Sequence, residues 1–190
     1  MEPWSFAHCL PYFKRMETSA LGPGEFRGAE GPLKVTRPEC NNPLFAAFIQ
    51  AGVEAGLGYT DDVNGFRQEG VCRFESSTFA GLRSSAAKRY LHPARATGNI
   101  YLKTEVRVAR IVIEGTRATG VEFVENGALR TANAGREVLL CAGAFNSPQI
   151  LKLSGIGPRD ELAAQGIPVR VESPGVGENL QDRYEVGVVS

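Results

Sequence analysis

One stretch, Glu137 to Gly157, constrains the fold of this chain more than any other; it reads EVLLCAGAFNSPQILKLSGIG. Its apolar run Val138–Leu140 ends in small residues, which predicts a buried strand that feeds a tight loop. Ser147 followed by Pro148 predicts a helix start, because a capping hydroxyl precedes a proline whose missing N–H costs nothing there. Gly155 suits the left-handed exit of that helix. The stretch therefore predicts a strand, a tight turn and a helix in succession.

The turn of this stretch is a candidate ligand site, and its small residues Ala142 and Gly143 are the candidate contact positions. A strand, a turn with little side chain and a helix N-terminus together let a backbone approach the sugar or phosphate of a dinucleotide. The same succession is equally typical of any strand–turn–helix unit in an α/β core. The residues by themselves leave both interpretations open.

The order of residues after the turn resembles a known family signature. Gly143–Gly157, with its S-P-x-I-L-x-L-S-G-I-G order, is similar to the second signature of the glucose–methanol–choline (GMC) oxidoreductases, and SPGVGENLQD at Ser173–Asp182 also resembles that family. The resemblance implies FAD as the cofactor, near Ala142 and Gly143, and an alcohol whose CH–OH group is oxidised. It also implies an electron acceptor, which is oxygen, a quinone or another class that the residues do not specify.

Three further segments resemble the same family. The N-terminal W-S-x-x-x-x-L-P-Y-F-K order is similar to a segment that lies well inside family members. Asp62–Ala94 is similar to the part that crosses from the substrate side back into the FAD-binding fold. Thr104–Ile111 resembles the segment whose valine offers its backbone N–H and C=O to the adenine, and by position that valine is Val108. The resemblance therefore implies Val108 as a third cofactor-binding residue.

Helical signals recur along the rest of the chain. Ser5 is placed to cap a short N-terminal helix, and Asn42 followed by Pro43 predicts a helix of about four turns whose apolar stripe belongs to a core. A third helix is expected to start at Ser84 or Ser85 and to end at Pro93. A short helix is expected over residues 158–165.

Short strands punctuated by turn residues predict a β-meander between Asn99 and Leu140. Together with the resemblance, this implies a mixed α/β fold: a partial FAD-binding Rossmann-like domain with a β-meander, plus part of the substrate-binding domain. A further strand is expected near the end of the chain, as the first of a substrate-domain sheet. The other expected strands are Leu33–Thr36, Gly70–Phe79, Ile100–Lys103, Val106–Glu114, Ala118–Glu125, Ala128–Asn133, Glu137–Leu140 and Val169–Val171.

The resemblance also predicts how the chain is divided. Residues 1–80 are expected to form a partial substrate-side or lid segment, residues 81–165 part of the FAD-binding domain, and residues 166–190 the start of the substrate-binding domain. No G-x-G-x-x-G follows an N-terminal strand, and neither histidine lies in the context of the family's catalytic histidine, so no catalytic residue is assigned. We therefore expect an internal piece of a longer enzyme. Arg183 stands where the family usually has His, which bears on local packing and substrate subclass.

The amino-acid composition limits the classes of partner and of site that are expected. The 190 residues are 43% hydrophobic and carry 21 basic and 21 acidic side chains, without a basic tract, so nucleic acid is not an expected partner. Four isolated cysteines without a C-x-x-C pair argue against a metal site and against a disulfide framework. Reduced thiols, with no signal peptide or membrane-spanning run, favour a cytoplasmic location by default.

Two other functional classes fit the same residues. One is a truncated, non-catalytic binding module that keeps part of the fold. The other is a self-standing scaffold for protein interaction. A glycine-rich nucleotide motif upstream and a histidine-bearing segment downstream in the reading frame would favour the enzyme over both.

Overall fold

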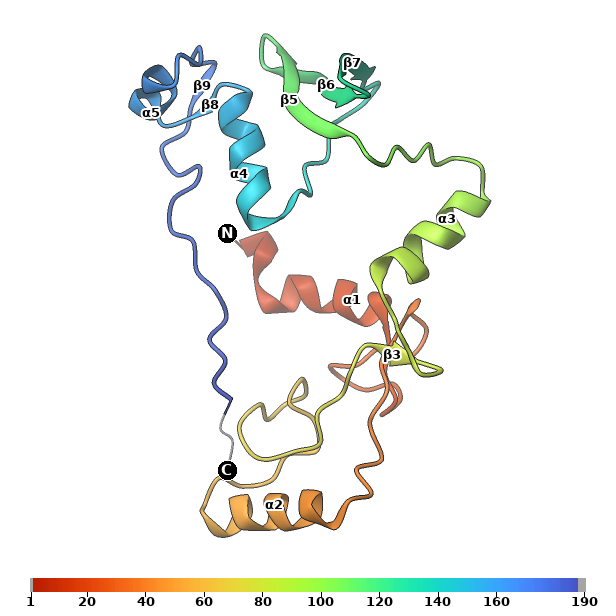
Figure 1. Cartoon of the computed structure of the whole chain (residues 1–190). Coiled ribbons are helices and arrows are strands. Elements are labelled where there is room, and N and C mark those ends of the chain that lie inside the picture. The colour runs from red at the N-terminus through yellow and green to blue at the C-terminus, as the bar shows by residue number, and fades with distance from the viewer. Residues whose placement is uncertain (1, 188–190) are drawn as a thin grey trace. The chain divides into compact units, whose positions relative to one another are not determined.

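The computed structural model describes residues 2–187, and it divides into two compact units, Met1–Tyr101 and Leu102–Ser190, which are described separately here. Helices and strands are mixed in the chain, as predicted (Figure 1). The division into units follows the packing of the backbone, whereas the predicted boundaries after residues 80 and 165 concern functional domains. Those boundaries stay a prediction. Within residues 2–187 no helix combines the length and the apolar character that crossing a bilayer requires.

The first unit is helical, with two small strand pairs. β1 and β2 pair in parallel, and β3 and β4 form an antiparallel pair. Its elements are a 3-10 turn Glu2–Trp4, α1 Phe6–Met16, β1 Glu17–Thr18, β2 Leu33–Lys34, α2 Pro43–Glu54, β3 Thr78–Phe79, β4 Leu82–Arg83, a π-helical turn Ala87–Leu91 and α3 His92–Ala96.

The predicted start of α2 is confirmed. Asn42 Oδ1 accepts a hydrogen bond from the Leu44 backbone N–H at 2.9 Å, and Pro43 occupies the first turn. The prediction that the apolar stripe of α2 forms a core is wrong for this structure, since Leu44 and Phe48 are 74% and 73% exposed. The amphipathic spacing therefore predicted the helix correctly, but the described residues leave its apolar face largely exposed.

Two expectations in the first unit are corrected. Pro93 does not end the helix before it: the backbone N–H of His92 donates to the carbonyl of Ala87, a π-type turn, and α3 continues to Ala96. A wider turn before a proline accommodates its missing N–H. The expected strand Gly70–Phe79 shrinks to Thr78–Phe79 and single bridges, one of them joining Thr36 to Ser76.

Buried ion pairs around Arg27 hold distant segments of the first unit together. The guanidinium lies 3.1 Å from Glu17 Oε1 and 3.3 Å from Asp62 Oδ1, it pairs with Glu75, and it donates to Ser19 Oγ at 3.1 Å. The Arg27 side chain is 7% exposed. Three carboxylates therefore share one buried cation, which links β1 to the loops after α2.

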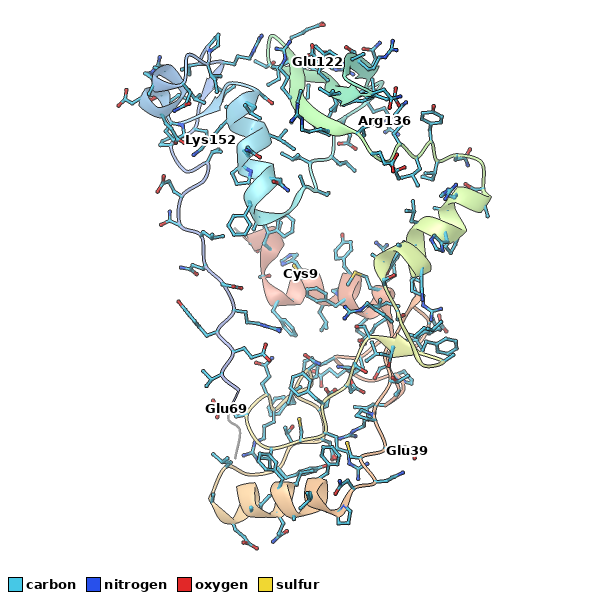
Figure 2. All side chains as sticks on the ribbon, in the orientation of Figure 1. Cys9, Glu39, Glu69, Glu122, Arg136 and Lys152 are labelled. Atoms are coloured by element: carbon cyan, nitrogen blue, oxygen red, sulfur yellow. The ribbon has the colours of Figure 1, made fainter. Side chains whose placement is uncertain are left out.

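The second unit is built on an antiparallel three-stranded sheet in the order β5-β6-β7, which confirms the predicted meander. Its central pairs include Val108 with Phe123, Ile111 with Val121, and Val124 with Leu129. On the sheet, Arg110 donates to both carboxylate oxygens of Glu122. Figure 2 labels the Glu122 side chain on the ribbon. Its elements are β5 Arg107–Glu114, β6 Arg117–Glu125, β7 Ala128–Asn133, α4 Gly143–Leu153, β8 Ile156–Gly157, α5 Arg159–Ala164 and β9 Val171–Glu172.

Two expected strands are absent from the described residues, and a third is absent as far as it can be followed. Glu137–Leu140 is irregular and Leu139 is 78% exposed, so the buried strand before the turn is a wrong prediction. A strand needs a hydrogen-bonded neighbour, and none of the described residues pairs with this segment. Ile100–Lys103 is irregular as well, and residues 178–187 contain no strand. The remainder of the strand expected at the end of the chain lies outside the described residues.

Candidate functional site

The turn before α4 has the backbone that close approach to a ligand requires. Gly143 opens the helix with φ +89°, a left-handed angle that side-chain-bearing residues rarely adopt. A Cβ built on Gly143 would meet no atom within 4 Å, so the turn faces open space. Ala142 precedes it as the N-cap residue. The predicted candidates Ala142 and Gly143 therefore stand together at the positive end of an 11-residue helix.

The predicted helix start at Ser147 is corrected, since α4 begins four residues earlier, at Gly143. Ser147 Oγ instead accepts a hydrogen bond from the Ala142 backbone N–H at 3.1 Å. Pro148, inside the helix, lacks the N–H that would bond to an earlier carbonyl. The serine hydroxyl thus still satisfies an unpaired N–H at the helix start, from within the helix rather than from before it.

Val108 lies on β5, the outer strand of the meander, whose only partner among the described strands is β6. The pairing register shifts between Val108 and Arg110, as in a β-bulge. Bulges leave backbone groups out of the ladder and are frequent beside binding sites. An outer strand with a register shift has the exposed main chain that the predicted role of Val108 needs.

One cavity, the β5–α4 cavity, brings the two candidate elements together. It has a volume of about 620 Å³, with Val108 on its strand wall and Ala142 on its helix wall. Gly143 adjoins Ala142 but does not line the cavity. The full lining is Val106, Arg107, Val108, Ala109, Ala142, Asn146, Gln149, Ile150 and Leu153.

Sequence reasoning missed the polar side chains of this cavity. Asn146 and Gln149 bring amide groups to the helix wall, and Arg107 brings a positive charge to the strand wall. Helical spacing was the signal that could have found them. Positions 146, 149, 150 and 153 follow the spacing i, i+3, i+4, i+7, which places them on one face of α4. The cavity offers an apolar surface with a few hydrogen-bonding groups, which is typical of a ligand site.

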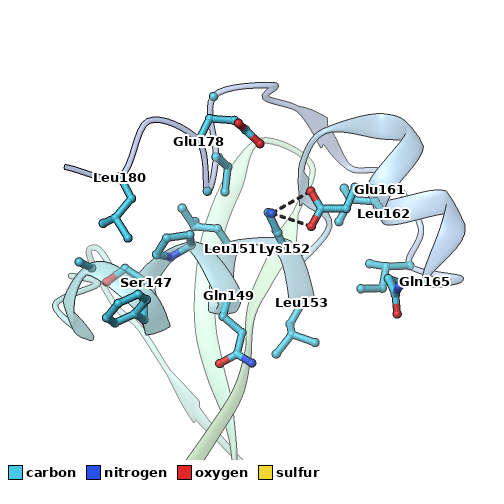
Figure 3. A pocket seen from close by; sticks show the side chains of 17 residues that line it. Ser147, Gln149, Leu151, Lys152, Leu153, Glu161, Leu162, Gln165, Glu178 and Leu180 are labelled. Atoms are coloured by element: carbon cyan, nitrogen blue, oxygen red, sulfur yellow. Dashed lines mark hydrogen bonds and ion pairs between the residues drawn. The ribbon is translucent and has the colours of Figure 1, made fainter. Parts of the chain in front are cut away.

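A second cavity, of about 860 Å³, shares Gln149 and Leu153 with the β5–α4 cavity and lies between α4, α5 and the loop Gly175–Leu180 (Figure 3). Lys152 donates to both carboxylate oxygens of Glu161, at 2.6 and 2.8 Å, across its wall. None of the predicted site residues Val108, Ala142 and Gly143 lines it. We therefore take the β5–α4 cavity as the candidate functional site.

Other reactive side chains do not form a competing centre. All four cysteines are free, and residues 2–187 contain no group of three or more His, Cys, Asp or Glu side chains placed to hold a metal ion. His8 is engaged locally, with Nδ1 2.7 Å from Ser5 Oγ. The candidate site therefore consists of backbone turns and neutral side chains, with one arginine.

Comparison with known proteins identifies the family. The family model described as GMC oxidoreductase matches residues 1–185 of this chain. The chain belongs to the GMC oxidoreductases. It is 53% identical over 188 residues to the oxygen-dependent choline dehydrogenase of Staphylococcus aureus (strain MSSA476), a match that covers 98% of this chain and 33% of that protein. The chain thus spans about a third of the length of the curated relatives that it matches.

Solved structures agree with this family assignment. An FAD-dependent oxidoreductase from Chaetomium thermophilum is similar with a TM-score of 0.87 and 33% identity, over 94% of this chain and 34% of that one. Pyridoxine 4-oxidase from Mesorbium loti is similar with a TM-score of 0.83 and 34% identity, over 92% of this chain and 34% of that one. The predicted mixed α/β fold of the FAD-binding type is confirmed by these similarities.

Proposed function

We propose that this chain forms one wall of the FAD site of a GMC-type oxidoreductase that acts on the CH–OH group of an alcohol. The observation that carries the proposal is the β5–α4 cavity, which brings Val108 and Ala142 to one space although they lie far apart in the sequence. Both residues, with Gly143, are the positions at which the family signatures imply cofactor contacts. The adenosine half of FAD is the part that we assign to this wall.

The residues that line the β5–α4 cavity fit the adenosine half of FAD. A volume of about 620 Å³ lies within the range of roughly 300–1,000 Å³ common for ligand sites. The outer strand at Val108 supplies backbone donors and acceptors for a base, and the N-terminal end of α4 favours a negatively charged group. Gly143 leaves space where any other residue would place a Cβ. These features support binding of a nucleotide through main chain rather than through a charged side chain.

When bound, FAD would supply the acceptor for a hydride from the alcohol carbon, and this chain's residues would bind and orient it. The base that takes the hydroxyl proton is assigned to no residue of this chain. The alcohol, and the acceptor that reoxidises the flavin (oxygen or a quinone), are parts of the proposal that rest on the names of the relatives. We also propose a cytoplasmic location, supported by the four free thiols.

A chimera tests the proposal. The 188 aligned residues of this chain would replace the matching third of the S. aureus choline dehydrogenase, which leaves the rest of that enzyme unchanged. We expect the purified chimera to retain FAD and to oxidise an alcohol, with choline as the first one tested. A folded chimera without bound flavin would contradict the proposal and favour the non-catalytic module.

Two matched variants locate the site within the chimera. Ala142→Asp puts a carboxylate on the β5–α4 cavity, where it would repel the phosphates of FAD, and we expect about tenfold or greater loss of affinity. Ala144→Asp puts the same group in the first turn of α4, on the lining of the other cavity, and should leave affinity unchanged. Acidic side chains are favourable at a helix N-terminus, and both substitutions lie there. The two variants should therefore differ little from each other in folding stability. Equal effects of both variants would argue against this cavity.

A further inference from the structure

Ser154 connects the two walls of the β5–α4 cavity. Its Oγ accepts a hydrogen bond from the Ile111 backbone N–H of β5 at 2.8 Å, and its own O–H donates to the Ile150 carbonyl of α4 at 2.6 Å. Ser154 is 4% exposed, and Ile111 and Ile150 are 8% and 7% exposed. A single buried hydroxyl therefore joins the outer edge of the sheet to the helix.

The Ser154 hydroxyl lies beside both walls of the cavity. Ile111 comes three residues after Val108 on the strand wall, and Ser154 directly follows Leu153, the last lining residue of the helix wall. The Ser154 bridge therefore lies just beyond the last lining residue of each wall. A displacement of β5 at this end would therefore carry the backbone of Val108 away from α4.

The residue after Ser154 anchors the bridge to the rest of the unit. Gly155 has φ +83°, and its carbonyl accepts hydrogen bonds from the N–H groups of Arg170 and Val171 at 2.9 and 3.1 Å. A Cβ on Gly155 would lie 2.5 Å from the Pro168 carbonyl oxygen. These contacts hold the backbone of Gly155, and through it that of the adjacent Ser154. The Ser-Gly pair thus has a fixed place from which the hydroxyl can hold the strand.

We propose that Ser154 is a positioning residue that sets the spacing between β5 and α4 and so the fit of the cavity to its ligand. This inference rests on the proposed function, because the ligand is the adenosine half of FAD. Without the hydroxyl, the Ile111 N–H would be buried and unsatisfied, and the strand would move to pair it with water or another acceptor. The cavity would then lose the geometry in which Val108 and Ala142 face one ligand.

Three substitutions at Ser154 separate positioning from folding. Ser154→Ala removes the hydroxyl, Ser154→Cys keeps a side chain of similar size with a weak acceptor, and Ser154→Thr keeps the hydroxyl. The control is Thr97→Ala in the other unit. It deletes an exposed hydroxyl that donates to the Ala94 carbonyl at 2.7 Å and accepts from the Asn99 N–H at 3.3 Å. Each variant is measured in the chimera for FAD dissociation constant, visible circular dichroism of the flavin and melting temperature, and in the 190-residue chain for amide exchange at Ile111.

We expect Ser154→Ala and Ser154→Cys to weaken FAD binding about tenfold, the change expected for one lost buried hydrogen bond, and to speed exchange at Ile111. Ser154→Thr should restore both, and Thr97→Ala should alter neither. A purely structural role would lower the melting temperature of Ser154→Ala while leaving FAD affinity and the flavin spectrum of the folded protein unchanged; that result would overturn the inference. If the unsubstituted chimera failed to bind FAD, the proposed function would fall and this inference with it.

Discussion

Gly143 combines two features that can be tested apart: a left-handed backbone and open space in front of its missing side chain. We predict that Gly143→Val in the chimera weakens FAD binding strongly while the protein stays folded. The physical reason is that the new side chain occupies the space beside Ala142 that the cofactor would use. Flavin occupancy and far-UV circular dichroism of the purified variant measure the two effects.

The control for this prediction is Gly127→Val in the β6–β7 turn. Gly127 has φ +78°, close to that of Gly143, and a Cβ there also meets nothing within 4 Å. Backbone strain of about 1–2 kcal/mol is expected in both variants, so only the effect on FAD should separate them. Val108→Ala should change FAD binding little, because its role is assigned to the main chain. Loss of flavin only in step with loss of fold would defeat the prediction.

Thiol reactivity gives a second prediction for single residues. Burial raises the pKa of the Cys72 thiol, whereas Cys141 is exposed. A raised pKa means less thiolate at a given pH, so Cys72 should react with iodoacetamide several-fold more slowly than Cys141 at pH 8. Its rate should also continue to rise at a pH where that of an ordinary thiol has levelled off. Mass spectrometry of the native chain, with the urea-unfolded chain as reference, would show equal rates for both cysteines if the prediction is wrong.

Between elements, the Arg27 cluster is the main polar connection of the first unit. It joins β1 to the segments that carry Asp62 and Glu75, with three carboxylates around one buried guanidinium. We predict that Arg27→Met lowers the free energy of unfolding by about 3–5 kcal/mol, because it leaves buried carboxylates without a cation. Urea denaturation followed by circular dichroism measures the loss.

Arg159→Met is the matched comparison for that prediction. Arg159 pairs with Glu172 at 2.8 Å between α5 and β9, and both side chains are more than half exposed. An exposed pair is worth only about 0–1 kcal/mol, so this variant should unfold near the parent. Equal losses for Arg27→Met and Arg159→Met would show that burial of the cluster does not matter.

For the whole chain, the dominant feature is uncovered apolar surface. The described chain exposes 14695 Å², while two separate globular domains of half its mass would expose together roughly 10,700 Å². Large side chains of the N-terminal 3-10 turn and of α2, namely Trp4, Phe48 and Leu44, contribute to this surface. Burial of apolar surface stabilises a protein by about 25 cal/mol per Å², so self-association that covers these side chains would be favourable.

We therefore predict that the 190-residue chain expressed alone forms oligomers or aggregates. Light scattering coupled to gel filtration would measure its mass in solution. The same 188 residues within the chimera should stay dispersed, because the remaining two-thirds of the relative can cover those faces. A monodisperse monomer of the isolated chain with a cooperative melt would contradict this prediction.

The cofactor gives the last prediction for the whole chain. The sequence has no glycine-rich G-x-G-x-x-G turn to hold the FAD diphosphate, although the strand assigned to the adenine is present. We expect the isolated chain to lose added FAD on gel filtration, while the chimera keeps it. A yellow fraction of the isolated chain, with a flavin spectrum that survives the column, would refute this.

Local signals determined much of this protein without tertiary information. The Asn42-Pro43 cap and the left-handed Gly155 lie where the sequence predicts them, because capping geometry depends on neighbours in the chain. The strand alternation of the meander is local in the same sense. The residue order also indicated the family, since nine of the 11 positions from Ser147 to Gly157 match the signature order S-P-x-I-L-x-L-S-G-I-G.

Tertiary structure decided what depends on residues distant in the chain. Val138–Leu140 is apolar enough for a strand, but no described strand pairs with it, and the described residues leave most of the α2 stripe exposed. Helix α4 starts at Gly143 and not at the predicted Ser147. The Ser147 hydroxyl accepts a hydrogen bond from the Ala142 N–H, across the first turn of the helix. The meeting of Val108 with Ala142, and the Ser154 bridge to Ile111, required three-dimensional packing, because no local pattern specifies which strand edge lies against which helix.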